Sequence, residues 1–351
     1  MRVFTCDNCG QLVFFDNDRC LRCDSPLGYV HQRRELVSLT EVAPDHLVDL
    51  GSPVRAWQRC ATRPVTGCNW LVPAGTGALC ESCRLTRTRP ADTDAEGMAE
   101  LVRGEMAKRR LIFQLAELGL PVTPRDEAAG QGLAFDLLSS VGTKVITGHD
   151  NGVITLDLAE ADDEHREHLR LQLNEPYRTL LGHFRHEIGH YYFFRLVGPS
   201  GEYVKEFTEL FGDPDEDYQD ALDRHYSQGP PEGWERDFVS SYATMHPAED
   251  WAETFAHYLH IRDTLDTSAA FSFAPAGATY ERRTLGPSGF DTLIEMWLPL
   301  AWALNMVNRS MGKGDLYPFV LTPPVLEKMR FIHSVIDEIT AEPVTLAAIS
   351  A

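Results

Sequence analysis

The residues His186-Glu-Ile-Gly-His190 carry the clearest chemical signal in this sequence. Two histidines four positions apart on a helix project about 40° from one another, so both imidazoles can bind one metal ion. Glu187 lies between them in angle and faces the same side of the helix. This HExxH spacing is typical of zinc hydrolases, in which the glutamate takes a proton from a water molecule that the metal activates. The motif predicts a catalytic zinc site with His186 and His190 as ligands and Glu187 as the general base.

A catalytic zinc ion needs a third protein ligand and one open coordination position. A third histidine six residues after His190 is absent, because position 196 is Leu196. Pro247 suits the first turn of a later helix, on which Glu249 and Glu253 would lie one turn apart on the same face. One of these carboxylates would bind the metal while the other would hydrogen-bond the distal nitrogen of a ligating histidine. A solvated acidic start of a helix is the alternative interpretation.

The eight cysteines form a second chemical pattern, confined to the first 83 residues. They fall into two sets, Cys6, Cys9, Cys20 and Cys23, then Cys60, Cys68, Cys80 and Cys83. Three C-x2-C pairs have the spacing that brings two thiolates to one tetrahedral metal ion. We therefore predict two structural zinc ions, one in each set. The wider Cys60–Cys68 spacing leaves an interleaved pairing open, and disulfides are an alternative that would need an oxidising compartment.

Composition and charge limit the classes of partner. The chain has 351 residues and 43% hydrophobic residues, enough for two domains with buried cores. Residues 1–90 hold 11 arginines against nine acidic residues, a net charge of +2, which leaves −22 for residues 91–351. Because nucleic-acid binding relies on lysine and arginine neutralising phosphates, we expect a peptide or protein substrate and no nucleic-acid partner. The apolar run 297–304 is shorter than the ~20 residues that a membrane span needs, and residues 1–6 contain no extended apolar stretch. We expect a cytoplasmic protein without membrane association.

Hydrophobic periodicity predicts the elements that must position these residues. The pattern is helical over residues 98–118, 176–196, 247–264, 290–311 and 325–339, and strand-like over 133–138, 144–147 and 153–158. Residues 84–96 are polar and indicate a linker, and the acidic stretch after Gly198 is expected to be irregular. The strand over 153–158 is either an edge to which an extended peptide can add or an internal strand of a sheet.

Five stretches of the chain resemble a family of bacterial proteins described as putative zinc-binding metallopeptidases with an N-terminal zinc ribbon. These stretches are CDNCGQLVFFDNDRCLRC, HFRHEIGHYYF, LFGDPDEDY, SSYATMHPAEDWAETFAHYLHI and NRSMGKGDLYPF. The resemblance extends over almost the whole chain. It implies an α+β protein in which a zinc-ribbon domain at residues 1–90, small and β-rich, precedes a zincin-like domain of the gluzincin type at residues 91–351.

The spacing Tyr-x6-Glu-x3-Glu is also locally similar to the zincin site of anthrax lethal factor. Carried over by position, this similarity implies that Glu249 is the third zinc ligand, that Glu253 supports a ligating histidine, and that the Tyr242 hydroxyl lies near the metal. The chain departs from the pattern at His246, which is a candidate second ligand or oxyanion partner near the site.

The combined prediction is a zinc metallopeptidase that holds one catalytic and two structural zinc ions. Zinc on His186, His190 and Glu249 would activate water, Glu187 would act as general base, and Tyr242 would stabilise the oxyanion. The main alternative is an adaptor that binds a protein partner through the same fold without turnover. The intact Glu187 argues against it. A peptidase that acts on DNA-bound proteins is a third interpretation, which the acidic body disfavours.

Overall fold

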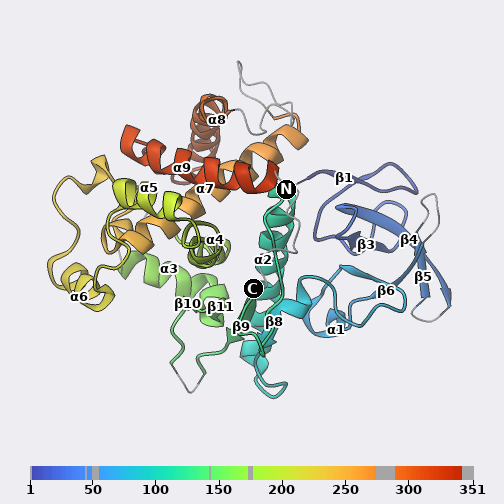
Figure 1. Ribbon diagram of the computed structural model, residues 1–351. Coiled ribbons are helices and arrows are strands. Elements are labelled where there is room, and N and C mark those ends of the chain that lie inside the picture. Colours follow the sequence, from blue (N-terminus) through green and yellow to red (C-terminus); the bar gives the residue numbers. More distant parts are fainter. Residues whose placement is uncertain are drawn as a thin grey trace. The chain divides into compact units, whose positions relative to one another are not determined.

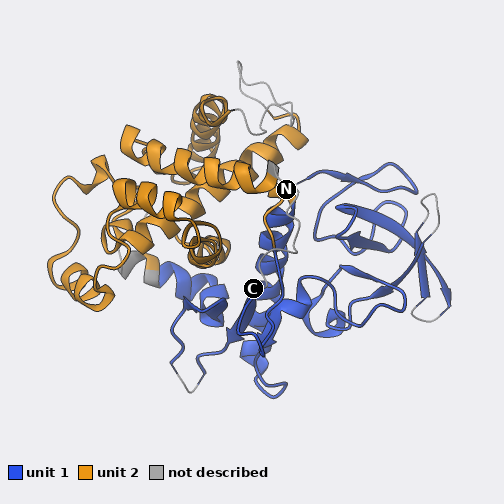
Figure 2. Cartoon of the chain, in the orientation of Figure 1, with its two compact units in different colours: residues 1–116, 122–169 blue, residues 117–121, 170–351 orange. Residues whose placement is uncertain are grey.

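The chain forms two compact units in a computed structural model that describes residues 2–43, 46–49, 55–141, 144–172, 177–273 and 289–341. The first unit combines residues 1–116 with 122–169, and the second combines residues 117–121 with 170–351 (Figure 2). The predicted domain boundary at residue 90 was placed after the last cysteine motif. The two compact units are divided at other residues and do not test it, so it stays a prediction.

The cysteine-rich part of the first unit is built from short antiparallel strands (Figure 1). Strands β1 (Phe4–Thr5) and β2 (Leu12–Val13) form a two-stranded ribbon. The neighbouring five-stranded sheet runs in chain order through β3 (Leu27–Val30), β4 (Glu35–Ala43), β5 (His46–Asp49), β6 (Ala56–Arg59) and β7 (Leu71–Pro73). The short helix α1 (Arg63–Thr66) lies between β6 and β7, and a 3-10 turn spans Cys83–Leu85.

A mixed sheet completes the first unit, with strand order β10-β11-β9-β8. The sheet consists of β8 (Thr86–Thr88), β9 (Ala134–Leu138), β10 (Gly148–Asp150) and β11 (Val153–Asp157). Helix α2 (Ala95–Leu118) packs on both parts of the unit: Phe113 contacts Phe15, with ring centroids 4.9 Å apart, and the Lys108 ammonium lies 5.6 Å from the Phe135 ring of β9. A 3-10 turn (Leu158–Ala161) leads into helix α3 (Asp163–Gln172).

The structure corrects two predictions for this sheet and decides a third that the sequence left open. The linker predicted at 84–96 contains β8, a polar strand tied to its neighbour by the ion pair of Arg87 with Asp136. The strand predicted at 144–147 lies at 148–150, because the two-residue turn of Asn151 and Gly152, both with positive φ, sets Asp150 opposite Val153. Strand β11 pairs with β10 on one side and with β9 on the other, so of the two alternatives left open by the sequence the internal strand is the correct one.

The described residues of the second unit form helices joined by loops and turns, with no strand among them. It contains α4 (Leu180–Tyr192), a π-helical turn (Phe193–Val197), α5 (Gly201–Phe211), α6 (Tyr218–Gln228), α7 (Pro247–Ala270), α8 (Phe290–Ser310) and α9 (Pro323–Ala341). Two 3-10 turns, Trp234–Arg236 and Tyr242–Thr244, precede α7. Within the parts of the chain that the structure covers, no helix is both long and apolar enough to span a membrane.

Helices α5 and α6 occupy the stretch that was predicted to be irregular. Side chains cap both N-termini: Ser200 accepts a hydrogen bond from the Tyr203 backbone, and Asp217 accepts one from that of Asp220. In α6 only Ala221 is buried, so the helix has too little apolar periodicity to be recognised from its sequence. The predicted start of α4 at Pro176 falls outside the described residues. Thr179 caps that helix by accepting a hydrogen bond from the Gly182 backbone.

The close packing of α4 against α7 positions the candidate site. Gly189 lies inside the HExxH motif, and a Cβ atom there would stand 3.0 Å from the Ala252 Cα of α7. The neighbouring Trp251 donates its indole hydrogen to the Gly189 carbonyl at 2.9 Å. The buried Lys328 of α9 holds the first turn of α7 by an ion pair with Asp250 at 2.6 Å. These contacts fix the start of α7 beside the two histidines of α4.

Candidate active site

Three atoms from α4 and α7 converge on one point. The Nε2 atoms of His186 and His190 lie 3.2 Å apart. The Oε2 atom of Glu249 lies 2.9 Å from the first and 3.5 Å from the second. Ligands at 2.0–2.1 Å around a tetrahedral zinc ion are separated by roughly 3.4 Å, so these spacings suit three corners of such a site.

The protonation of His186 also fits a cation. The Glu253 Oε1 atom lies 2.7 Å from His186 Nδ1. Because an ionised carboxylate only accepts hydrogen bonds, Nδ1 carries a proton, which leaves Nε2 as the nitrogen that would bind a metal ion. Nε2 lies 2.9 Å from the buried Glu249 Oε2 atom. A cation between these two atoms, either a proton or a metal ion, would offset the charge of the buried carboxylate.

The pKa shifts show the same complementarity between acidic and basic groups. Burial alone would lower the pKa of His186, but its contacts with Glu249 and Glu253 raise it well above the usual value. Burial would raise the pKa of Glu249, yet His186 and His190 hold it well below its usual range. The pKa of Glu253 falls to about 2 for a similar reason, with His186 overcoming burial. The negative charge that favours a proton on His186 equally favours a metal cation at its Nε2 atom.

Glu187 lies near both histidines of this set. Its side chain is only 7% exposed, and the Oε2 atom has no hydrogen-bond partner among the described residues. Burial raises the pKa of this carboxyl above its usual value, although the neighbouring histidines oppose the shift. A buried carboxylate with a free oxygen and a raised pKa suits a group that takes and returns a proton.

Ser240 belongs to the site although the sequence did not single it out. Its hydroxyl donates to the Oε2 atom of Glu253 at 2.6 Å and accepts from the Ala243 backbone at 3.1 Å. Glu253 is therefore held at both oxygens, by Ser240 and by His186. This arrangement orients the imidazole, as expected for the partner of a metal ligand.

Tyr218 is a second residue that sequence analysis missed. It is the first residue of α6, and its hydroxyl donates to Glu249 Oε1 at 3.0 Å. The Tyr242 ring lies 6.0 Å from the His186 ring, and the predicted place of its hydroxyl near the metal stays a prediction. One feature of the sequence could have pointed to Tyr218. It is the last residue of LFGDPDEDY, one of the five stretches that resemble the metallopeptidase family.

The structure places His246 outside the set of converging atoms. Its Nδ1 atom accepts from the Ala248 backbone and its Nε2 atom donates to the Glu216 carbonyl, both at 3.0 Å. With both ring nitrogens bonded to the backbone, His246 caps α7 and has no lone pair for a metal ion. Asp213 similarly accepts from the Asp215 backbone at 3.0 Å, which makes it a turn residue.

The cysteines form two separate clusters in the first unit. In the first cluster the sulfur atoms of Cys6 and Cys23 lie 3.7 Å apart, and those of Cys9 and Cys20 lie 3.6 Å apart. In the second, Cys68 lies 3.7 Å from both Cys80 and Cys83, and Cys60 completes the set. Zinc–sulfur bonds of 2.3 Å give sulfur separations of roughly 3.8 Å, so both clusters suit a tetrahedral ion. None of the eight cysteines forms a disulfide, and the two sets do not interleave.

Helix α2 places buried charges beside the second cluster. The Glu105 Oε2 atom lies 4.0 Å from the Cys83 sulfur, and Glu105 Oε1 pairs with the Lys108 ammonium at 2.8 Å. The guanidinium of Arg109, also buried, donates to the Thr66 carbonyl at 3.4 Å and lies 4.0 Å from Glu105 Oε2. Lys108 and Arg109 together carry one positive charge more than Glu105 balances, which would partly offset the −2 charge of a zinc ion with four thiolates.

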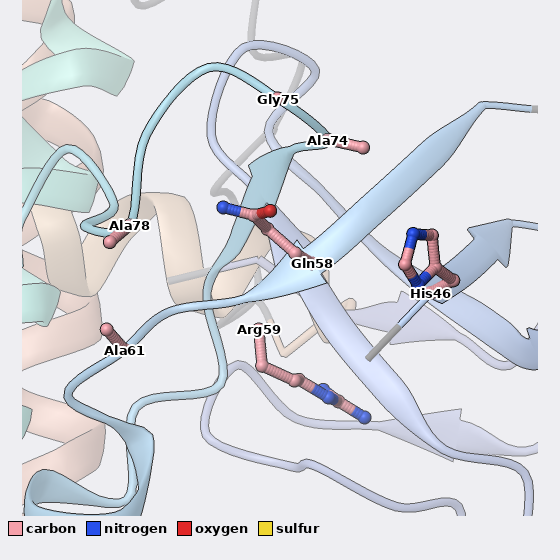
Figure 3. Close-up of a pocket in the computed structure, with 7 residues that line it drawn as sticks. All are labelled: His46, Gln58, Arg59, Ala61, Ala74, Gly75 and Ala78. Atoms are coloured by element: carbon pink, nitrogen blue, oxygen red, sulfur yellow. The ribbon is translucent and has the colours of Figure 1, made fainter. Parts of the chain in front are cut away.

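A pocket of about 290 Å³ in the first unit gathers no comparable chemistry. His46 and Arg59 line it together with small residues and Gln58 (Figure 3). Gln58 and Arg59 are neighbours on β6 and point to opposite sides of the strand, as successive strand residues do. Arg59 donates to the Leu27 carbonyl at 2.6 Å. The pocket therefore has no converging set of ligands or proton donors.

Comparison with known proteins agrees with this architecture and site. Residues 3–94 match the model of a zinc-ribbon domain, and residues 98–335 match the model of a family described as "putative zinc-binding metallo-peptidase". The chain belongs to that metallopeptidase family and carries an N-terminal zinc ribbon.

Its relatives share this organisation over nearly their full length. Uncharacterized proteins of Mycobacterium bovis and of two strains of Mycobacterium tuberculosis are each 60% identical to it over 343 residues, 97% of this chain and 97% of theirs. No solved structure matches the chain. The local similarity to lethal factor stays a prediction.

Proposed function

We propose that this protein is a zinc-dependent peptidase that hydrolyses peptide bonds at the site formed by α4 and α7. The observation that carries the proposal is the buried, unpartnered carboxylate oxygen of Glu187 beside three converging ligand atoms. Structural zinc sites close their coordination with four protein ligands, whereas catalytic sites keep three and leave one position open. Three ligands and a free base are the arrangement that hydrolysis requires.

His186, His190 and Glu249 would hold the metal, and Glu253 with Ser240 would keep His186 in the required tautomer and orientation. When bound, a zinc ion supplies Lewis acidity, which lowers the pKa of a coordinated water molecule to about 7 and polarises a carbonyl. Glu187 would take a proton from the attacking water and transfer it to the departing amine. Its raised pKa suits the second transfer, because a group that binds the proton too weakly receives it inefficiently.

The cysteine clusters would hold two further zinc ions with a structural role. Four thiolates per ion leave no position for substrate, so we assign neither cluster to catalysis. Eight cysteines without a disulfide suit a reducing compartment such as the cytoplasm. We propose a stoichiometry of three zinc ions per chain.

The proposal is tested by substituting Glu187→Gln and assaying cleavage of a peptide library together with zinc content. Gln has the same size but cannot take the proton, so we expect hydrolysis to fall by about 10²–10⁴-fold while three zinc ions are retained. Glu206→Gln is the matched control, because Glu206 is an exposed residue of α5 and should leave both measurements unchanged.

Three results would contradict parts of this assignment. Retained hydrolysis in Glu187→Gln would remove Glu187 as the base. Loss of a zinc ion in the same variant would make Glu187 a ligand. A wild-type chain that binds three zinc ions but cleaves nothing in the library would favour the adaptor, in which the same fold binds a partner without turnover.

A further inference from the structure

The two oxygens of Glu249 have different surroundings. The Oε2 atom faces His186 and His190, at 2.9 and 3.5 Å from their Nε2 atoms. The Oε1 atom accepts a hydrogen bond from the Tyr218 hydroxyl at 3.0 Å. A carboxylate can bind a metal through one oxygen or through both, and a donor on one oxygen favours binding through the other.

Tyr218 reaches Glu249 from a helix with little packing of its own. Helix α6 buries only Ala221 and lies between two irregular segments (Figure 1). Its contacts with the elements of the site come from residues at or next to its ends: Glu216 accepts from His246 at 3.0 Å, and the His225 Nδ1 atom lies 3.4 Å from the Thr244 hydroxyl. Of these hydrogen bonds, the one from Tyr218 to Glu249 is the strongest, because its acceptor is a charged carboxylate.

The direction of this hydrogen bond is fixed by chemistry. An ionised carboxylate only accepts, so the Tyr218 phenol must donate its single hydrogen to Glu249. The Tyr218 oxygen keeps its lone pairs, so it can still accept a hydrogen bond from another donor.

We infer that Tyr218 is a positioning residue that fixes Glu249 as a one-oxygen metal ligand, and that docking of α6 is needed to complete the site. This inference rests on the proposed function for the identity of the ligands. It adds a residue and a helix that the sequence motif does not contain.

The test is the zinc affinity of the third site in Tyr218→Phe, measured by competition with a chromophoric chelator on the full-length chain. The substitution removes one oxygen from a side chain that is 44% exposed, so the fold should survive. Loss of a partner of a metal ligand typically weakens binding by about 10–100-fold, and we expect a change in that range. Tyr226→Phe is the matched control, because Tyr226 is on the same helix, is 68% exposed and should leave the affinity unchanged.

Spectroscopy separates positioning from a general loss of stability. Cobalt(II) loaded into the third site reports coordination number, because four-coordinate cobalt absorbs visible light more strongly than five- or six-coordinate cobalt. We expect the absorption to weaken in Tyr218→Phe as Glu249 turns to bind through both oxygens. The spectrum of His190→Ala, which lacks the third site, is subtracted to remove any cobalt in the cysteine clusters.

A second variant tests the helix without changing Tyr218. Ala221→Asp places a charge at the one buried position of α6 and should undock the helix. We expect it to reproduce the loss of zinc affinity and the weaker cobalt absorption of Tyr218→Phe.

The inference is overturned if Tyr218→Phe binds zinc within twofold of the wild type with an unchanged cobalt spectrum. A raised KM with unchanged zinc affinity would instead make Tyr218 a substrate contact, which also overturns it. These results are distinct from failure of the proposed function, in which His190→Ala would release no zinc at all.

Discussion

The cysteine clusters and the histidine–glutamate site differ in the number of ligands they gather and in the groups left beside them. Each cluster brings four sulfur atoms together, and the second is buried on all sides with the charged residues of α2 next to it. The site on α4 and α7 gathers three ligand atoms, and the Oε2 atom of the nearby Glu187 has no hydrogen-bond partner among the described residues. Four ligands complete a tetrahedral site, whereas three are one short of it.

The supporting residues differ in the same way. Around the second cluster, Lys108 and Arg109 are buried together with Glu105, whose carboxylate pairs with the Lys108 ammonium at 2.8 Å. Around the histidines, Glu253 and Ser240 hold one imidazole and Tyr218 holds one carboxylate oxygen. A cluster built this way would stabilise the fold, whereas a site built from oriented single ligands would control the geometry of a reaction.

The largest expected effect comes from breaking the second cluster. In Cys80→Ser we expect loss of one zinc ion and loss of cooperative unfolding in the first unit, because structural zinc contributes up to ~10–16 kcal/mol in small zinc domains. Lys108 and Arg109 would also remain buried beside a site that has lost its negative charge. Zinc content and urea unfolding followed by circular dichroism measure both effects.

His190→Ala is the matched substitution in the other region. It should also release one zinc ion, but the second unit keeps its helices because the packing of α7, α8 and α9 does not depend on the metal. If His190→Ala unfolded its unit as completely as Cys80→Ser, the distinction between structural and catalytic sites would fail.

The parts of the site that the sequence predicted are those encoded at fixed spacing along one helix. His186, Glu187 and His190 share one face of α4, and Glu249 with Glu253 share one face of α7, as helical periodicity requires. The cysteine pairs were recognisable for the same reason, because C-x2-C is a local geometry. Helical periodicity likewise located α2, α8 and α9 to within a few residues. It located the start of α7, which continues six residues beyond its predicted end.

The residues that escaped prediction act over long distances from polar segments. Tyr218 and Ser240 reach the site from α6 and from the turn before α7, and nothing in their neighbours fixes where those segments dock. Strand β8 was taken for a linker because its side chains are polar, although Arg87 pairs with Asp136 on β9. Hydrophobic patterns reveal elements that bury apolar faces. Tyr218, Ser240 and strand β8 are instead held in place by hydrogen bonds and an ion pair.

A smaller effect is expected from removing the charge of Glu253. In Glu253→Gln the amide no longer favours a proton on His186 Nδ1 as strongly, so Nε2 becomes a weaker ligand. We expect zinc affinity at the third site to fall by about 10–100-fold, equivalent to ~1.4–2.7 kcal/mol. The zinc in the cysteine clusters should be unaffected, which a chelator titration of the same sample shows directly. Equal weakening at all three sites would mean that the substitution acts through the fold and not through His186.

The last expected effect appears only in acid, and it belongs to α7. His257 is buried, and its Nδ1 atom lies 2.8 Å from the Tyr317 hydroxyl. Burial lowers the pKa of this imidazole to about 4, although Glu253 acts in the opposite direction. The unfolded chain has a histidine pKa of about 6.5, so between these values the unfolded state binds a proton that the folded state does not. The stabilising contribution is therefore complete above pH ~6.5 and is lost as the pH falls toward 4.

His257→Asn removes this titration while keeping a polar side chain opposite Tyr317. Measured in the His190→Ala background, where release of zinc from the third site cannot contribute, the free energy of unfolding of the second unit should depend less steeply on pH between 4 and 6.5. The difference in slope should approach one proton, or ~1.4 kcal/mol per pH unit at most. His165→Asn, at an exposed position of α3, should leave the slope unchanged. If both variants behaved alike, burial of His257 would not account for any acid sensitivity of the second unit. The contrast between the candidate site and the cysteine clusters would then rest on the metal ligands alone.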